Sequence, residues 1–298
     1  MSFVIAAIYK FFSLDDPEGF AGQLRDVFEK HEIKGTLILA SEGINGTVCS
    51  DRAGIDALVD FLKTHDIFQG SQYKEALSDE QVFKRSKVKI KKEIVTFGCA
   101  VDPTKLVGKY VEPEAWNELI SRPDVILIDT RNKYEFKLGT FKGAINPETD
   151  NFKQFSKFVE DNLADKKGCP IAMFCTGGVR CEKSTSYLAM LGFKEVFHLN
   201  GGILKYLEKI DEQGSLWQGQ CYVFDLRVSV GHGLKKGQNR ICSGCGMPIL
   251  ADEVDENGVK LGLVCRECSD AQFCSQKKLF SAKNSEQKQS KKQPNLSL

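Results

Sequence analysis

One stretch of the chain decides the fold of its central part: Pro170-Ile-Ala-Met-Phe-Cys175-Thr-Gly-Gly-Val-Arg180-Cys181-Glu-Lys-Ser184. Its apolar run, 170–174, predicts a buried parallel strand of the kind found in α/β domains. Cys175 follows at the carboxyl end of this strand, which is where open α/β sheets place their active crevices. The glycines allow a tight turn, and we expect a helix to begin near Glu182. The stretch therefore predicts an α/β domain with a cysteine at its functional edge.

The loop after Cys175 has the composition of an anion cradle. It consists of Thr176, Gly177, Gly178, Val179 and Arg180, and Cys181 follows it directly. Successive N–H groups in a glycine-rich turn at a helix N-terminus point inward and favour negative charge. Together with Arg180 they favour the thiolate, so we expect Cys175 to be a nucleophile with a depressed pKa. The alternative is that Cys175 is an unreactive cysteine packed after the strand. The sequence leaves three roles open for Cys181: a resolving thiol, a polar group that supports the loop, or a packed residue.

The neighbouring segments extend the same domain. Apolar runs at 125–128 and 196–199 predict two further buried parallel strands. Helical segments that would cross between the strands are expected at 152–163, 183–191 and 203–213. Residues 103–113 read as a linker and cover, so the α/β domain is expected to occupy about 109–217.

The N-terminal region predicts a different arrangement of helices and strands. Its order is strand, helix, strand pair, helix and strand, which is the split βαβ or ferredoxin-like arrangement. The expected strands are 3–12, 36–40, 47–50 and 87–96, and the expected helices are 18–31 and 51–64. Between the paired strands, Ser41-Glu42-Gly43-Ile44-Asn45-Gly46 has residues that suit a tight connection.

The α/β region resembles the rhodanese superfamily. The resemblance is carried by Asp129-Thr-Arg131 followed by Tyr134-Glu135, by Gly139-Thr-Phe-Lys-Gly143-Ala-Ile-Asn-Pro147, by the Cys175 loop and by His198-Leu-Asn-Gly201-Gly202-Ile203. It implies that the loop cysteine carries a persulfide. Asp129 and Arg131 are read either as support for the loop or as a salt-bridged strand end. Related protein phosphatases use Cys-x5-Arg, so the Cys-x4-Arg spacing here argues against phosphate ester hydrolysis.

The order of the parts over about residues 1–275 resembles one bacterial family, the oxygen-dependent tRNA uridine hydroxylases, which were formerly an uncharacterised protein family with a rhodanese domain. This narrower resemblance is carried by the motif at 41–46, by Lys87-Val-Lys-Ile-Lys91, by Ile128-Asp129-Thr-Arg131-Asn132 and by Cys175-Thr-Gly-Gly-Val-Arg-Cys-Glu-Lys183. It implies conversion of the wobble uridine of tRNA to 5-hydroxyuridine, with O2 as co-substrate. It also implies that Cys175 is the essential catalytic residue, acting through a persulfide.

The charge distribution leaves room for an RNA partner. The chain has 41 Lys+Arg and 40 Asp+Glu, so its net charge of +1 is too small for the whole molecule to attract polyanions. Locally, however, Lys87, Lys89 and Lys91 would share one face of the predicted strand 87–96. Such a stripe suits phosphate contacts with tRNA. A solvated face that protects a sheet edge is the alternative.

No cofactor signature accompanies the predicted oxygen chemistry. There is no two-His-one-carboxylate pattern for iron and no Gly-x-Gly-x-x-Gly fingerprint for a flavin or nicotinamide. The activation of O2 and the source of electrons are therefore left open, and the hydroxylase assignment rests on the resemblance.

A second cysteine group lies near the C-terminus. Cys242-Ser-Gly-Cys245 and Cys265-Arg-Glu-Cys268 are two Cys-x2-Cys pairs at a spacing typical of structural zinc sites. Four thiolates match the tetrahedral preference of zinc, so we predict one structural zinc ion. Cys274 is a spare sulfur that could replace one ligand. The remaining cysteines, Cys49, Cys99, Cys169 and Cys221, are read as packing residues.

These observations give a multidomain α/β and α+β chain. The expected parts are a ferredoxin-like domain at 1–100, a rhodanese domain with a parallel sheet at 101–222, a zinc-binding module at 223–276 and a disordered basic tail at 277–298. With no signal peptide and no apolar stretch of about 20 residues, we expect a cytoplasmic protein without a membrane partner. The alternatives to the hydroxylase are a rhodanese-type sulfurtransferase, which passes persulfide sulfur to a thiol, cyanide or RNA, and a non-enzymatic RNA-binding protein. The oligomeric state is left open.

Overall fold

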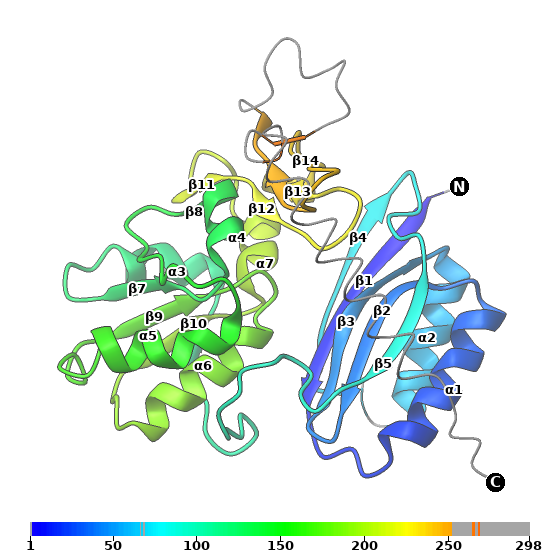
Figure 1. The fold of residues 1–298 in the computed structure, drawn as a ribbon, viewed down its shortest axis with the longest axis horizontal. Helices are drawn as coiled ribbons and strands as arrows, with labels where there is room; N and C mark the ends of the chain where they lie inside the picture. Colours follow the sequence, from blue (N-terminus) through cyan, green and yellow to red (C-terminus); the bar gives the residue numbers. More distant parts are fainter. Residues whose placement is uncertain (1, 66, 68, 252–263, 266–267, 269–298) are drawn as a thin grey trace, which may run out of the picture. The chain divides into compact units, whose positions relative to one another are not determined.

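The computed structural model describes residues 2–65, 67, 69–251, 264–265 and 268 (Figure 1). The chain forms two compact units, 1–237 and 238–298. Within the first unit we call residues 3–90 the N-terminal domain and residues 109–230 the central domain. The expected tail at 277–298 and Cys274 lie outside the described residues.

The N-terminal domain has one sheet covered by two helices on one face (Figure 1). The sheet has five strands in the order β4-β1-β3-β2-β5. In chain order the elements are β1 (Phe3–Phe11), α1 (Pro17–Lys30), β2 (Lys34–Ala40), β3 (Gly43–Ser50), α2 (Arg52–Thr64), β4 (Gln72–Ser78) and β5 (Ser86–Ile90). The first six reproduce the predicted ferredoxin-like order, which is confirmed.

The strand that completes the ferredoxin-like order is β4, so the prediction that 87–96 plays this part was wrong. β4 pairs antiparallel with β1, whereas β5 is an extra edge strand that pairs parallel with β2 and ends at Ile90. The sequence of β4, Gln-Tyr-Lys-Glu-Ala-Leu-Ser, shows no clear apolar alternation because no residue of this edge strand is fully buried. Its backbone pairing with β1 decides its structure.

The connection at 41–46 also differs from the prediction. Only Ser41 and Glu42 link β2 to β3, and the glycines belong to β3. A Cβ atom on Gly46 would lie 2.0 Å from the carbonyl oxygen of Thr36 on the neighbouring strand. This glycine therefore serves close strand contact within the sheet.

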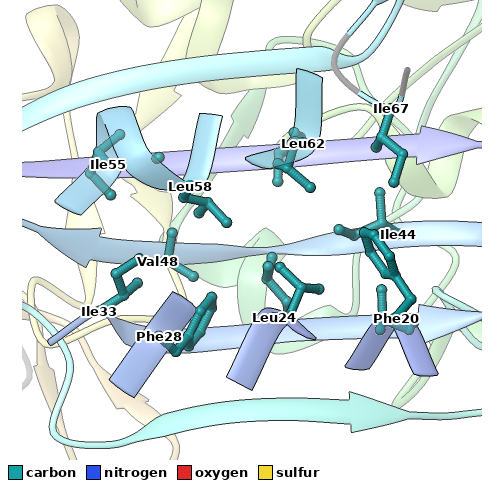
Figure 2. Close-up of a cluster of buried hydrophobic side chains, with 14 of the residues drawn as sticks. Phe20, Leu24, Phe28, Ile33, Ile44, Val48, Ile55, Leu58, Leu62 and Ile67 are labelled. Carbon is teal, nitrogen blue, oxygen red and sulfur yellow. The ribbon is translucent and has the colours of Figure 1, made fainter. Parts of the chain in front are cut away.

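The core of the N-terminal domain lies between the sheet and its helices (Figure 2). Buried side chains from the two helices, Phe20, Leu24, Phe28, Ile55, Leu58 and Leu62, pack against the sheet. Each contributes about 1.5–3 kcal/mol by leaving water. Because strand side chains alternate, Val4 and Ile8 of β1 point to the helices and Tyr9 points to the opposite face. We call this opposite side the helix-free face.

The central domain contains the predicted parallel sheet. Its four strands have the order β6-β10-β9-β7, and all neighbouring pairs are parallel. They are β6 (Lys109–Val111), β7 (Ile126–Asp129), β9 (Ile171–Phe174) and β10 (Val196–Leu199). β7, β9 and β10 were predicted, but β6 lies in the segment predicted to be a linker. Because β6 has only three residues, two of them exposed, the pattern of its sequence is too short to indicate a strand.

Helices cover both faces of the central sheet. On one face lie α5 (Phe155–Asn162) and α6 (Val179–Met190), and on the other lie α3 (Pro113–Ile120) and α7 (Gly202–Lys209). All four residues of β9 are consequently buried. α6 begins at Val179, three residues before the expected start, because Gly178 takes a φ of 110° and caps the helix. α7 ends at Lys209, before the expected end at 213.

Smaller elements complete the described chain. In the central domain they are α4 (Lys133–Leu138), β8 (Gly139–Phe141), η1 (Phe152–Gln154), β11 (Trp217–Gly219), β12 (Cys221–Tyr222) and β13 (Ser229–Val230). They are followed by η2 (His232–Leu234), and the second unit contains β14 (Arg240–Ile241) and β15 (Pro248–Ile249). No helix in the described residues has the length and apolar composition needed to cross a membrane.

Candidate functional site

Cys175 lies at the carboxyl end of β9, as the sequence predicts. Its side chain is buried, and its sulfur accepts a hydrogen bond from the Gly178 N–H at 3.1 Å. Gly178 is the residue before α6, so this N–H belongs to the positive end of a helix. Its φ of 110° is a conformation that favours glycine. The Gly178 N–H therefore gives the sulfur one donor of the kind that an anion cradle requires.

The electrostatic environment separates the two neighbouring cysteines. Burial opposes ionisation of Cys175, but a hydrogen bond from Cys181, the charge of Arg180 and nearby backbone N–H groups outweigh it and lower the pKa of Cys175 to about 5. Burial and the adjacent Cys175 sulfur raise the pKa of Cys181 well above its ordinary value. Cys175 is thus the thiolate and Cys181 the thiol that donates to it.

Arg180 is held by a residue that was not among the predicted site residues, Glu135 in α4. Its Nη1 and Nη2 atoms lie 2.7 and 2.8 Å from the two carboxylate oxygens, and Nη2 also donates to the Thr176 hydroxyl at 3.2 Å. Burial opposes ionisation of Glu135, but Arg180 outweighs it and lowers the pKa of the carboxyl. Tyr134-Glu135 carries part of the rhodanese resemblance, and the Asn132-x-x-Glu135 capping-box spacing marks the start of α4, but neither predicts the pairing of Glu135 with Arg180.

Asp129 and Arg131 form a buried ion pair with each other. Arg131 Nη2 lies 2.6 Å from Asp129 Oδ2 and 2.5 Å from the Gly139 carbonyl oxygen. Thr140 donates to the same carboxylate at 3.0 Å. Between the paired residues, the Thr130 hydroxyl lies 3.6 Å from the Cys181 sulfur. Thr130 is therefore the member of this segment with a hydrogen bond to the cysteine pair.

The N-terminal domain contributes two side chains to the Cys175 loop. The Tyr9 hydroxyl of β1 donates to Glu182, in the first turn of α6, at 3.0 Å. The hydroxyl of Tyr110, which belongs to β6 of the central domain, donates to the same carboxylate at 2.8 Å. Burial raises the pKa of Glu182. Lys74 of β4 donates to the Gly177 carbonyl oxygen at 3.2 Å. No local pattern in the sequence indicates these contacts, because β1 and β4 are far from the loop along the chain.

The run at 41–46 has a role in joining the two domains. Lys183 of α6 is 1 % exposed, and its Nζ lies 2.8 Å from Glu42 and 2.7 Å from Glu93. Glu42 accepts a hydrogen bond from the N–H of Ile94 at 2.7 Å, and Asn45 donates to the carbonyl of Ile94 at 3.0 Å. The motif thus fixes the segment after β5 against both the sheet and α6.

A cleft of about 900 Å³ opens above Cys175. One wall is the helix-free face, including Ala7, Tyr9 and Thr36, and the other is the Cys175 loop. Cationic and aromatic side chains also line the cleft, namely Lys74, Lys91, Lys153, Phe83, Phe152 and Phe224. The volume and the lining suit a nucleotide-sized ligand with a negative charge.

The three predicted RNA-contacting lysines are exposed but not equivalent. Lys87 and Lys89 pair across the sheet with Thr36 and Ile38, two residues that line the cleft. Paired residues of neighbouring strands share a face, so both lysines extend the helix-free face at its edge. Lys91 lies beyond the end of β5 and lines the cleft itself. The predicted strand 87–96 would have aligned all three lysines on one face. The observed strand β5 ends at Ile90, before Lys91.

The second unit contains the four predicted cysteine ligands. The sulfurs of Cys242, Cys245, Cys265 and Cys268 all lie within 4.8 Å of one another. The Cys245 and Cys265 sulfurs are 3.8 Å apart. A tetrahedral site with Zn–S bonds of about 2.3 Å requires S···S distances of about 3.8 Å, so the cluster fits a zinc-sized ion. With four protein ligands it would leave no open position.

Comparisons with known proteins agree with this architecture. Residues 3–94 match the family model described as the UPF0176 acylphosphatase like domain, and residues 112–209 match the rhodanese-like domain. Similar solved structures include the Alr3790 protein from Anabaena (17 % identity, 37 % of this chain and 91 % of that chain, TM-score 0.31). Others are a rhodanese-related protein from Thermoplasma volcanium (20 % identity, 34 % and 92 %, TM-score 0.29) and a rhodanese-like domain protein from Staphylococcus aureus (24 % identity, 36 % and 97 %, TM-score 0.28). The chain thus has an acylphosphatase-like domain of the UPF0176 type followed by a rhodanese-like domain, an order that matches the architecture of the UPF0176 family.

Proposed function

We propose that this protein hydroxylates the wobble uridine of tRNA to 5-hydroxyuridine in an oxygen-dependent reaction. The observation that supports this most is the position of Cys175, an ionised thiol that lines a cleft of about 900 Å³ beside the helix-free face. The cleft has room for one extruded nucleotide, and aromatic side chains such as Phe152 and Phe224 supply surfaces on which a base can stack. The resemblance to the tRNA uridine hydroxylases supplies the reaction.

The chemistry of uracil suits a sulfur nucleophile. C6 of uracil is electrophilic, and addition of sulfur from Cys175, as a thiolate or a persulfide, would make C5 electron-rich. Hydroxylation at C5 consumes one O2, two electrons and two protons, and it releases one water. A pair of small-molecule thiols oxidised to a disulfide would supply the electrons. The residues that bind the RNA are proposed to be Lys87, Lys89 and Lys91, because all three flank or line the cleft.

Nucleoside analysis of tRNA tests the proposal directly. Cells that lack the protein are complemented with the wild type, with Cys175→Ser, or with Cys169→Ser as a matched cysteine control that does not line the cleft. We expect 5-hydroxyuridine and its derivatives to disappear with Cys175→Ser and to persist with the control. If deletion leaves these nucleosides unchanged, the hydroxylase proposal fails.

A sulfurtransferase is the second candidate, and the Cys175 loop favours it. The Gly178 N–H that binds the Cys175 sulfur at 3.1 Å is a group that would also hold a persulfide. Loss of a thiolated nucleoside in the deletion strain, or transfer of sulfur from thiosulfate to cyanide by the purified protein, would support this function. RNA binding without either reaction would support the non-enzymatic alternative.

We also propose that Cys242, Cys245, Cys265 and Cys268 hold one structural zinc ion. The spacing of their sulfurs supports this, as does the absence of any fifth side chain in the four-cysteine cluster of the described residues. The zinc would stabilise a short segment by joining its two ends.

A further inference from the structure

Lys74 connects the N-terminal domain to the Cys175 loop. It lies on β4, where it pairs with Ala7 of β1, and its side chain is partly buried at the cleft. Its Nζ atom donates to two backbone carbonyls of the central domain, those of Gly177 and Gly201. A cationic side chain of the N-terminal domain therefore donates hydrogen bonds to the backbone of the central domain.

The Gly177 carbonyl belongs to the same peptide group as the Gly178 N–H. No cis peptide bond occurs in the described part of the chain, so the C=O and N–H of this planar group point in opposite directions. Lys74 binds the oxygen on one side at 3.2 Å, and the Cys175 sulfur accepts the N–H on the other side at 3.1 Å. We propose that Lys74 is a positioning residue that holds this peptide with its N–H directed at the Cys175 sulfur.

The Gly177–Gly178 peptide is the part of the loop on which such a restraint acts most directly, because Lys74 binds its oxygen. Both residues of the peptide are glycines, which have the widest choice of backbone conformations. A Cβ atom added to Gly177 would have no neighbour within 4 Å, so no side chain packs against that residue on this side. A rotated peptide would turn its oxygen towards the sulfur and repel the thiolate. The bond from Lys74 opposes that rotation.

The second bond of Lys74 fixes the loop relative to α7. Gly201 precedes this helix, whose Ile203 and Leu204 N–H groups donate to the carbonyls of Cys175 and Thr176 at 3.0 and 3.1 Å. The first turn of α7 thus already supports the Cys175 loop through two backbone hydrogen bonds. Lys74 adds a side-chain connection between the same two segments. Displacement of β4 would disturb both ends of the loop together.

The charge of Lys74 strengthens its effect through the peptide. A cation on the carbonyl oxygen polarises the peptide group, which makes its N–H a stronger donor. Burial lowers the pKa of Lys74 to about 8, so the side chain is still mainly cationic at pH 7. This role concerns the reactivity of Cys175 and is independent of whether the acceptor is uridine and oxygen or a sulfur acceptor.

The test uses Lys74→Met in the full chain, with Lys205→Met as the matched control. Lys205 is a neighbouring cation that lowers the pKa of Lys74 but pairs with Glu112 at 2.7 Å. The rate of Cys175 alkylation by iodoacetamide against pH gives its pKa without any RNA present, and NMR of the Gly178 amide reports its hydrogen bond. We expect Lys74→Met to raise the pKa of Cys175 by about one unit, a tenfold loss of thiolate at a pH below both values, and to move the Gly178 amide proton upfield. The control should change neither.

Two results would overturn the proposal. An unchanged Cys175 pKa in folded Lys74→Met would show that the Gly177–Gly178 peptide keeps its orientation without Lys74. A raised pKa with an unchanged Gly178 amide would show that Lys74 acts only as a charge through space. If Lys74→Met does not fold, Lys74→Gln and Lys74→Arg replace it, and only Lys74→Arg is expected to keep both readouts near the wild type. Since neither readout requires tRNA hydroxylation, failure here is distinguishable from failure of the proposed function.

Discussion

The guanidinium of Arg180 donates two hydrogen bonds to the carboxylate of Glu135, with N···O distances of 2.7 and 2.8 Å, and both side chains are buried. Arg180 is therefore not the free positive charge that the loop sequence suggests. It forms a neutral pair whose orientation is fixed, and the Thr176 hydroxyl, 3.2 Å from Nη2, connects the pair to the loop. The backbone N–H groups and Cys181 share with Arg180 the stabilisation of the Cys175 thiolate.

Glu135→Gln should destabilise the central domain strongly. The change leaves the buried guanidinium of Arg180 without its counter-charge, and removal of one partner from a buried pair costs about 3–5 kcal/mol. The free energy of unfolding in urea measures this loss. Glu118→Gln, an exposed position on α3, is the control and should leave the unfolding midpoint unchanged. A midpoint in Glu135→Gln equal to that of the wild type would show that the pair contributes no net stability.

The reactivity of Cys175 should change near pH 5. Its pKa is lowered to about 5 from an ordinary value near 9, so the thiolate is present above pH 5 and alkylation should rise between about pH 4 and 6 and then stay level. Because the pKa is depressed in the folded protein, ionisation of Cys175 stabilises the fold fully above pH 9. This stabilisation declines as the pH falls from 9 to 5 and is lost below 5. Peptide mass spectrometry after iodoacetamide treatment measures the alkylation, and a Cys175 step near pH 9 would contradict the prediction.

Gly178→Ala should disrupt the loop through two separable effects. An alanine at a φ of 110° costs about 1–2 kcal/mol, and its Cβ would lie 2.6 Å from the Tyr9 hydroxyl oxygen. Tyr9→Phe removes that oxygen and leaves ring contacts of 3.4 Å or more, so the loss from Gly178→Ala should be smaller in the Tyr9→Phe background. Thermal unfolding of the single and double variants measures the coupling.

Gly177→Ala is the matched control for that comparison. Space around Gly177 is open, and its φ is not positive, so an alanine there should be tolerated. If Gly178→Ala lowers the unfolding temperature equally in the wild-type and Tyr9→Phe backgrounds, a clash with the Tyr9 hydroxyl does not contribute to the loss.

The salt dependence of tRNA binding should fall when Lys87 and Lys89 are both changed to alanine. If each lysine contacts one phosphate of a single-stranded region, the slope of log K against log salt should decrease by about 1.4. The control changes Lys157 and Lys166, two lysines of the central domain that do not line the cleft. An unchanged slope in Lys87→Ala/Lys89→Ala would assign these lysines to protection of the sheet edge.

Removal of metal should affect the second unit selectively. Purified protein should contain about one zinc per chain, since four thiolates complete one tetrahedral site. A chelator should then make Cys242 and Cys265 reactive towards alkylating agents and the second unit sensitive to protease, because the bound metal supplies folding energy. Cys175 alkylation, measured in the same samples, is the control and should not change. A metal-free preparation whose second unit resists protease would contradict the prediction.

The segments that were predicted correctly have strong local patterns. The apolar run of β9 is buried on every side, and its sequence shows this directly. Asp16 and Pro17 mark the start of α1, where Asp16 accepts a hydrogen bond from the Gly19 N–H at 2.9 Å. By contrast, β4 is an edge strand of mixed polarity, and its residues take extended structure because β1 offers backbone partners. Local sequence cannot display a partner that lies more than 60 residues away.

The position of the candidate site follows from the sequence alone to a large extent. A cysteine after a buried strand, followed by glycines and an arginine, specifies an anion cradle because backbone N–H groups converge there in any such turn. Two Cys-x2-Cys pairs at this spacing predict a four-sulfur cluster, and the four sulfurs do lie within 4.8 Å of one another. Only the tertiary structure decides which groups from the N-terminal domain reach the cradle. Tyr9 and Lys74 contact the Cys175 loop because the helix-free face of their sheet forms a wall of the cleft, and this packing depends on contacts distant in sequence.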